Sequence, residues 1–334
     1  MDDLLEPIEI PSFEFPISTV TGLAAITAEA VDIKDIFWTC HLDYRPELIQ
    51  PNGKISYPGH GGLVLGAKND NYTRGTIRSD KESFNHSITF LVSTKIKNVT
   101  LRFSVTSIHI SGAKSYDDGC EAVTTLVQRL QTMGLLQQRL ISFSEELKGW
   151  IYHHLSAISK GPETDDGDHY VMYCDYWPAP LVDVGRYLMS FVYDYELHSE
   201  YLEHIKHLLS LRQPYLYHIA IREIQTSMIN YIYDLNFPVD NRLMVKHLNN
   251  RHGFVVNEEK SSSIVHLPYE RIAHNLSKEK KGTPHHSFTI TKNGFVTQSS
   301  PNERMAEEAY LMFRTAMEHL RSLVAPRPTL TLLC

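Results

Sequence analysis

The alternation of hydrophobic and polar positions between residues 99 and 133 changes its period once. Residues 100–110 are rich in β-branched side chains at every second position, which is typical of strands with one buried face. Residues 111–115 are small and interrupt this alternation. After Cys120 the apolar positions recur every third or fourth residue and form one stripe of a helix: Val123, Leu126, Val127 and Leu130. The pattern predicts a hairpin, a turn and an amphipathic helix, in that order.

A weaker copy of this pattern lies near the C-terminal end. Residues 286–297 predict a second hairpin with Asn293-Gly294 as its turn signal, and residues 305–320 predict a second amphipathic helix. Phe103 of the first copy aligns with Phe288 of the second. The second hairpin is longer by an even number of residues, which keeps each side chain on its face. The chain is therefore expected to contain an internal repeat.

Each copy is preceded by a segment that predicts a strand followed by a short helix. In the first copy the strand is expected over residues 17–27 and the helix over residues 32–42, with Asp32 as its N-cap. In the second copy, residues 228–239 form the corresponding strand and its exit.

Further segments add to this repeated pattern. Residues 62–68 predict a strand, and residues 69–98 form an insertion in which residues 87–93 predict another strand. Between the copies, residues 136–158 and 182–211 have apolar positions at helical spacing. We expect a helical insertion there, which could serve as a docking module.

Composition narrows the class of protein only slightly. The 334 residues are 42% hydrophobic, and no apolar run reaches the roughly 18 residues of a membrane span. The first six residues are acidic where a secretory signal would be basic, so we expect an intracellular protein that is not secreted and has no membrane partner. The cysteines, Cys40, Cys120, Cys174 and Cys334, are widely scattered and are expected to be free thiols.

Charge is unevenly distributed along the chain. The formal net charge is −7. Residues 131–219 carry 6 Lys and Arg against 12 Asp and Glu, whereas residues 220–326 carry 13 against 11. Because nucleic-acid binding depends strongly on neutralising phosphates, the second copy is the better candidate for that contact.

Four short motifs together resemble the half-repeat of the TATA-box-binding protein (TBP) family. They are Leu-Arg-Phe-Ser at residues 101–104, Gly-Ala-Lys-Ser at residues 112–115 leading into a helix, Gly-Leu-Val-Leu at residues 62–65, and the short helix at residues 31–36. The resemblance implies an α+β fold, a TBP-like saddle of two pseudo-symmetric half-repeats in which a curved antiparallel sheet carries helices on its convex face. The helical insertion is added to that saddle.

The resemblance also implies a division of the chain. The expected parts are an N-terminal arm (1–16), repeat 1 (17–133, with its insertion at about 69–98), a helical insertion (134–220), repeat 2 (221–325) and a C-terminal tail (326–334).

In the family, the concave sheet face lies in the DNA minor groove and phenylalanines wedge between base steps. By resemblance, Phe103 and Phe288 are the candidate wedge residues, while the partner positions, near His60 and near Lys260 or Ser261, carry no phenylalanine. The further DNA-binding candidates are Thr19, Thr21, Asn230, Arg102, Lys114 and Lys292. An Asn amide suits the minor groove because it can bond the acceptors that A·T and T·A pairs share.

Each of these candidates also has a structural interpretation. Phe103 and Phe288 are core residues if the strand phase differs by one position. Lys114 can solvate a turn. Lys292 belongs to a local basic patch that can simply face solvent; its other members are Arg271, Lys278, Lys280, Lys281, His285 and His286.

A more particular likeness comes from residues 227–239, followed by Leu-x-Val-x-x-Leu at residues 243–248. These motifs resemble the TBP-like proteins of large nucleocytoplasmic DNA viruses. That resemblance implies a viral transcription-initiation factor that binds A/T-rich double-stranded DNA and acts with RNA polymerase and a transcription factor B-like protein. Its implied location is the cytoplasmic viral factory or the nucleus, with packaging in the virion as a further alternative.

The competing hypothesis is a TBP-fold protein-interaction or virion-structural module that no longer binds DNA. The acidic charge and the missing wedge partners favour it. No phosphate-binding loop, nucleophile elbow or Cys-His pairing is recognisable, so no enzyme activity and no cofactor are expected. His198, Glu200, Glu203, His204 and His207 have helical metal-ligand spacing, but we interpret them as a polar helix face, with no metal.

Overall fold

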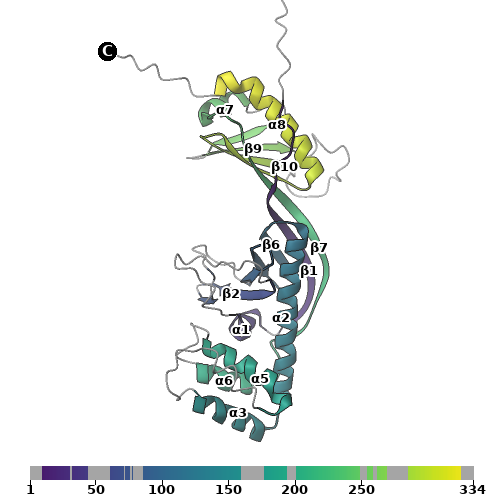
Figure 1. Cartoon of the computed structure of the whole chain (residues 1–334), viewed down its shortest axis with the longest axis vertical. Coiled ribbons are helices and arrows are strands. Elements are labelled where there is room, and N and C mark those ends of the chain that lie inside the picture. Colours follow the sequence, from purple (N-terminus) through teal and green to yellow (C-terminus); the bar gives the residue numbers. More distant parts are fainter. Residues whose placement is uncertain are drawn as a thin grey trace, which may run out of the picture. The chain divides into compact units, whose positions relative to one another are not determined.

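The computed structural model describes residues 10–30, 32–43, 61–70, 72–75, 77, 86–158, 177–193, 201–248, 254–258, 262–268 and 285–324 (Figure 1). The chain divides into two compact units. We call residues 22–225 the central unit, and residues 1–21 with 226–334 the terminal unit. Two long strands, β1 (Ile17–Ala30) and β7 (Leu216–Asp234), contribute residues to both units.

The central unit contains a sheet in the strand order β3-β2-β4-β5-β6-β1-β7. Its other strands are β2 (Leu63–Asn69), β3 (Tyr72–Gly75), β4 (Ile88–Ser93), β5 (Asn98–Phe103) and β6 (Ser107–Ala113). The predicted strand at 87–93 is confirmed by β4. The short helix α1 (Ile33–Thr39) is also present, and Asp32 caps it by accepting a hydrogen bond from the Lys34 amide at 2.7 Å.

Helix α2 (Tyr116–Ser142) covers one face of this sheet with the predicted apolar stripe, which is buried. The helix is longer than expected, because it continues through Gly134 into the segment predicted as a separate helix. A side chain at Gly134 would lie 2.7 Å from the Leu216 carbonyl oxygen, so a glycine permits α2 to approach β7 closely. The helix ends before Phe143, and α3 (Glu145–Ile158) follows it.

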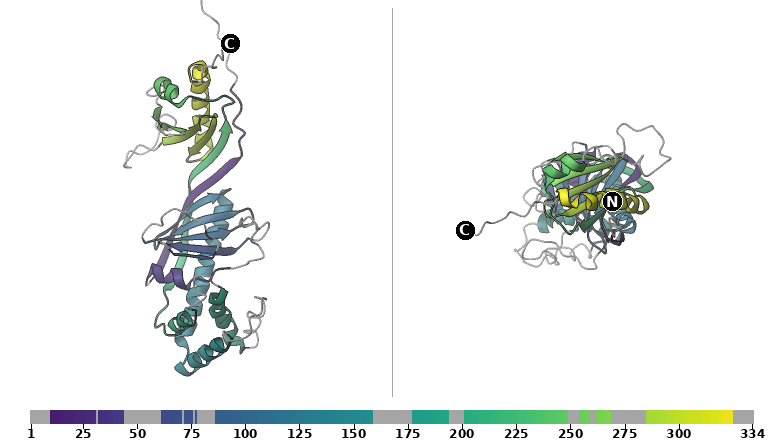
Figure 2. Two further views of the ribbon diagram at one scale, coloured as in Figure 1. Left: turned by 90° about the vertical axis from the view of Figure 1, so that its left-hand side faces the viewer. Right: turned by 90° about the horizontal axis from the view of Figure 1, so that it is seen from above.

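The segment 182–211, predicted as one helical stretch, forms several helices. They are α5 (Ala179–Met189), the 3₁₀ turn η3 (Ser190–Tyr193) and α6 (Tyr201–Leu209). We call α3, α5, η3 and α6 the helical module; Figure 2 shows it beyond one end of the central sheet.

Buried hydrogen bonds join the helical module to the rest of the central unit. The Tyr187 hydroxyl donates to the Thr39 carbonyl at 2.9 Å. The Gln137 side chain of α2 donates through Nε2 to the Tyr187 hydroxyl at 3.3 Å. The module is therefore held against α1 and α2 by polar contacts as well as by apolar packing.

In the terminal unit, β7 is followed by the strand order β11-β10-β9-β8, with β1 on the other side of β7. The strands are β8 (Val255–Glu258), β9 (Ser262–Pro268), β10 (His285–Thr291) and β11 (Phe295–Ser300). Helices α7 (Asn241–Leu248) and α8 (Glu303–Val324) accompany them. Gly294 in the predicted turn has φ +90°, and its amide donates to the Thr291 carbonyl, so the hairpin prediction is confirmed.

The same chain order of elements occurs in both units. A strand, a short helix, a run of strands and a long helix follow one another from β1 to α2 and again from β7 to α8. The lateral order also corresponds, since β2-β4-β5-β6-β1 in the central unit matches β8-β9-β10-β11-β7 in the terminal unit. Among the described strands, β3 is the one added in the central unit. Among the described residues, no helix has the length and apolar character that crossing a membrane requires.

Candidate nucleic-acid interface

The terminal unit has one sheet face that points away from the core. Along β7, Ile229, Tyr231 and Tyr233 are buried, so Asn230 and Ile232 between them lie on the opposite face. Strand pairing extends that face laterally, because Asn230 is opposite Ser299 and Ile232 is opposite Thr297. The open face of the terminal unit includes Met228, Asn230, Ile232, Asp234, Val255, Asn257, Ile264, His266, Ser287, Thr289, Phe295, Thr297 and Ser299.

None of these open-face side chains is a lysine or an arginine, and Asp234 at the end of β7 is the acidic member. The others are short hydroxyls, two amides, one imidazole and apolar groups. The Asp234 carboxylate accepts from the Asn236 amide at 2.8 Å. Such a face matches the hydrogen-bonding edges and sugars of a groove better than it matches phosphate.

A hydrogen-bond chain fixes the amide of Asn230 on this face. Ser299 Oγ donates to Asn230 Oδ1 at 2.6 Å, and Asn230 Nδ2 donates to Thr19 Oγ1 at 2.8 Å. Thr21 lies two residues after Thr19 on β1, and its hydroxyl donates to the Met228 carbonyl at 3.4 Å. The structure thus brings together Thr19, Thr21 and Asn230, which the sequence analysis selected separately.

Asn230 retains hydrogen-bonding capacity in this arrangement. An amide nitrogen carries two N–H groups, and one of them bonds Thr19. The chain from Ser299 holds the amide plane in one orientation, so the second N–H is presented in a defined direction.

Phe103 and Phe288 require a correction. Both rings are 0% exposed and belong to the core. Phe288 stacks on Phe313 of α8 with centroids 4.2 Å apart, and Phe103 meets Phe90 edge-on at 6.4 Å. A ring packed beneath the helices cannot enter a base step. Phe103 and Phe288 are therefore core residues and not wedge residues.

A different aromatic side chain occupies the open face. Phe295 begins β11 and is 51% exposed, as is Ile232 on β7. Phe295 shares its face with Thr297 and Ser299. Sequence reasoning missed this residue. Its position directly after the Asn293-Gly294 turn and the alternation along β11 could have assigned it to the open face.

The open face of the central unit has a different chemistry. Cross-strand pairs align Lys68 with Thr89, Thr89 with Arg102, and Arg102 with His109. Lys68 is buried, Arg102 is half-buried and His109 is exposed. This row carries positive charge on the sheet face opposite α2.

The two predicted lysine sites lie at chain turns. Lys114 is exposed just before α2, and its amide donates to Asp118 Oδ2 at 2.7 Å. Lys292 is exposed in the β10–β11 turn, where its carbonyl accepts from the Val239 amide. In the basic patch, His286 is buried and bonds Ser300 Oγ at 2.8 Å through Nδ1. Arg271, Lys278, Lys280 and Lys281 lie outside the described residues, as do His60, Lys260 and Ser261.

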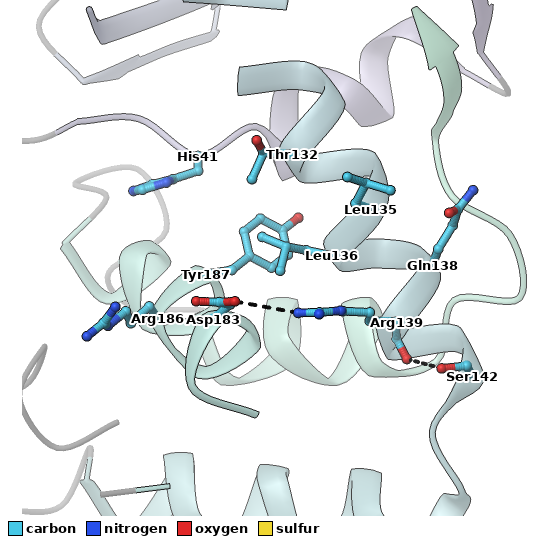
Figure 3. A pocket seen from close by; sticks show the side chains of 10 residues that line it. All are labelled: His41, Thr132, Leu135, Leu136, Gln138, Arg139, Ser142, Asp183, Arg186 and Tyr187. Atoms are coloured by element: carbon cyan, nitrogen blue, oxygen red, sulfur yellow. Dashed lines mark hydrogen bonds and ion pairs between the residues drawn. The ribbon is translucent and has the colours of Figure 1, made fainter. Parts of the chain in front are cut away.

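A cavity of 640 Å³ in the central unit is remote from the sheet's open face. It lies between α2 and α5, with Leu135 and Leu136 on one wall and Tyr187 at its centre (Figure 3). Arg139 and Asp183 form an ion pair at 3.5 Å across it, and both side chains are exposed. Because water screens such a pair, the two charges contribute little to the binding properties of this cavity.

His41 at the edge of this cavity is held neutral. Burial is the main cause that lowers its pKa to about 4, and the positive charge of Arg129 lowers it further. Its Nδ1 lies 2.8 Å from Arg129 Nη1, and Arg129 in turn bonds Asp43 at 2.6 Å. The network fixes the entry to β2. Across the described ranges, no group of three or more His, Cys, Asp or Glu side chains is placed to bind a metal ion.

Comparisons with known proteins give likenesses to solved structures. No protein-family model matches this sequence, and no curated protein matches it. Among solved structures, the chain is similar to one titled "Methanococcus jannaschii TBP", with a TM-score of 0.37 and 11% sequence identity over 92% of this chain and 99% of that chain. At this degree of likeness, the function of the chain has to be argued from its own residues.

Proposed function

We propose that this chain is a non-enzymatic, TBP-like DNA-binding factor that uses its open sheet faces on duplex DNA and acts in transcription initiation. The observation that carries the proposal is the amide of Asn230 on the open face of the terminal unit, held between Ser299 and Thr19 among hydroxyl and apolar neighbours. The minor groove offers acceptors on A·T pairs and sugar edges on its walls, which such a face complements.

The repeated order of elements supports two half-repeats. The strand orders β2-β4-β5-β6-β1 and β8-β9-β10-β11-β7 correspond one to one, and a short and a long helix recur at matching positions. We propose that the halves are pseudo-symmetric and form the curved saddle that the sequence resemblance implies. The viral context, with RNA polymerase and a transcription factor B-like partner, rests on the motifs at 227–239 and 243–248.

The two open faces would make different contributions to DNA binding. Arg102 on the central unit supplies positive charge for phosphates, which is the main source of affinity for DNA, and His109 lies opposite it on the neighbouring strand. The terminal unit supplies polar and apolar contacts. We reassign the wedge role to Phe295, because an exposed ring can bury itself against a base step and offset the cost of unstacking.

Binding of the full chain to fluorescent duplexes tests this function. We expect preference for an A·T-rich over a G·C-rich duplex, with affinity that falls steeply as salt rises. Asn230→Ala should reduce the preference. Thr124→Ala changes an exposed residue on α2 and should behave as the unmodified protein. Absence of binding to either duplex at low salt would contradict the proposal.

The second candidate is a protein-interaction or virion-structural module without DNA binding. The excess of acidic residues in the segment 131–219, which contains the helical module, favours this candidate because negative charge repels phosphate. It predicts that the DNA titration fails while a protein partner binds the helical module.

A further inference from the structure

A second cavity of the central unit, of 310 Å³, lies between α1, α6 and the residues that lead into β7. Its walls come from segments far apart in the sequence. They are Asp35, Trp38 and Thr39 of α1, Glu203, His204 and His207 of α6, and Tyr215. None of these residues has a part in the proposed DNA contact.

The cavity is lined by two carboxylates that have no strong cationic partner. None of the ion pairs found among the described residues includes Asp35, and burial followed by the neighbouring charge of Asp32 raises its pKa, while His207 lowers it. Glu203 has only Lys206 at 3.9 Å, with both side chains largely exposed. A positively charged group in the cavity would offset the repulsion between the carboxylates of Asp35 and Asp32.

His204 provides a further unpaired polar atom at this site. Its Nε2 is buried and has no hydrogen-bond partner among the described residues. Burial is the largest cause that lowers the pKa of His204 to about 4, and the charges of Arg74 and His207 add to it. The ring is therefore neutral at physiological pH, and a buried polar atom of this kind is normally paired.

The remaining walls are aromatic and hydroxylic. Tyr215 bonds His207 Nε2 through its hydroxyl, and burial with the charges of Asp35 and Asp32 raises the pKa of Tyr215 to about 12. Trp38 is half-buried and meets Tyr72 edge-on at 5.3 Å. An indole beside carboxylates is a favourable environment for a cation, because the ring quadrupole attracts positive charge.

The cations around the cavity do not occupy it. The Arg74 guanidinium is buried behind α1, donates to the carbonyls of Phe37 and Cys40, and lies over the Phe37 and Phe191 rings. Its hydrogen bonds are directed at main-chain carbonyls. Lys206 is at the exposed rim.

We infer that this cavity receives a basic side chain, a guanidinium or ammonium group, from a protein partner that docks on the helical module. The volume is at the small end of ligand pockets, which suits one long side chain. Asp35 and Glu203 on its walls make a positively charged side chain the complementary occupant. The inference does not depend on DNA binding, since it uses a different part of the central unit.

A peptide titration of the full chain tests the inference. The probe is acetyl-Gly-Arg-Gly-amide, and its control replaces arginine with citrulline, which has nearly the same shape and no charge. Binding is followed through the indole N–H signal of Trp38 by NMR, assigned with Trp38→Phe. We expect a saturable shift of that signal with the arginine peptide and little shift with the citrulline peptide.

Matched charge changes separate the pocket from general electrostatics. Asp35→Asn should weaken arginine-peptide binding by about fivefold or more, the size expected for one ion pair. Glu146→Gln removes an exposed carboxylate from α3 of the same module and should leave binding unchanged. Glu203→Gln provides a second pocket variant, and the thermal unfolding of all variants checks that they fold.

Two results would overturn the inference. One is equal binding of the citrulline peptide. The other is equal weakening by Asp35→Asn and Glu146→Gln in folded proteins. Either result leaves the A·T-rich DNA titration unaffected, so failure here and failure of the proposed function are distinguishable.

Discussion

Asn230 Nδ2 on β7 donates to Thr19 Oγ1 on β1 at 2.8 Å, which links two residues 211 positions apart in the sequence. The bond lies on the open face of the terminal unit, and Ser299 Oγ donates to Oδ1 at the other end of the amide. The orientation of Asn230 is therefore a property of three neighbouring strands.

A charge placed at Asn230 should abolish its contribution to DNA binding. Asn230→Asp keeps the shape of the side chain but replaces donors with a carboxylate, which phosphates repel and which cannot donate to base acceptors. We expect affinity for an A·T-rich duplex to fall about tenfold or more. Gln128→Glu on α2 makes the same change of amide to acid away from the open face and should lower affinity far less; equal losses would show that net charge alone is responsible.

Phe288 and Phe295 should give opposite results when each is changed to alanine. Phe288→Ala removes a ring that stacks on Phe313, so the free energy of unfolding of the terminal unit should fall by about 3 to 5 kcal/mol. Phe295→Ala removes an exposed ring and should leave stability nearly unchanged while weakening DNA binding. Denaturant unfolding and duplex titration measure the two effects. A stable Phe288→Ala protein with lost DNA binding would restore the original wedge assignment.

Arg74 should be essential for the stability of the central unit. It is 1% exposed and bonds the Cys40 carbonyl at 2.9 Å, at the end of α1. Arg74→Met would leave carbonyls at that helix end without a donor, and we expect a loss of about 3 kcal/mol. Arg139→Met removes an exposed arginine of the same unit that pairs with Asp183 and should cost far less. Denaturant unfolding followed by tryptophan fluorescence compares the two; equal losses would contradict the assignment.

His41 should make the protein less stable as the pH falls. Its folded-state pKa of about 4 lies below the ordinary value of 6.5, so the unfolded chain takes up the proton first. Protonation of His41 does not affect the free energy of unfolding above pH 6.5 and lowers it progressively from pH 6.5 down to about 4. His41→Gln should flatten this part of the stability profile, whereas His153→Gln, at an exposed position on α3, should not. A wild-type profile in the His41 variant would refute the assignment.

Local sequence pattern was sufficient to predict several elements. At one point, the face on which Phe103 lies, the family resemblance contradicted that pattern. The Asn293-Gly294 hairpin, the Asp32 cap and the apolar stripe of α2 follow from residues close together in the sequence, and all three are confirmed. The alternation of Val99, Leu101 and Phe103 already placed Phe103 on the apolar face of its strand. The family resemblance suggested the other face, and because a one-residue change of phase reverses every side chain, that suggestion failed.

The ends of the helices were harder to predict. Gly134 within α2 is a weak helix position by propensity, and the segment after it was assigned to another helix. Only the approach of the Leu216 carbonyl shows why a glycine is required there.

The sequence by itself determined the order of strands and helices, the repeated pattern and the residue types available for DNA contact, because these depend on hydrophobic period and on turn and cap residues. Tertiary structure alone decided which distant residues meet. It bonds Thr19 to Asn230, buries Arg74 beneath α1, and places Asp35 and Tyr215 around one cavity. Such contacts depend on strand register and helix packing between segments far apart in the chain, and no local pattern encodes those distances.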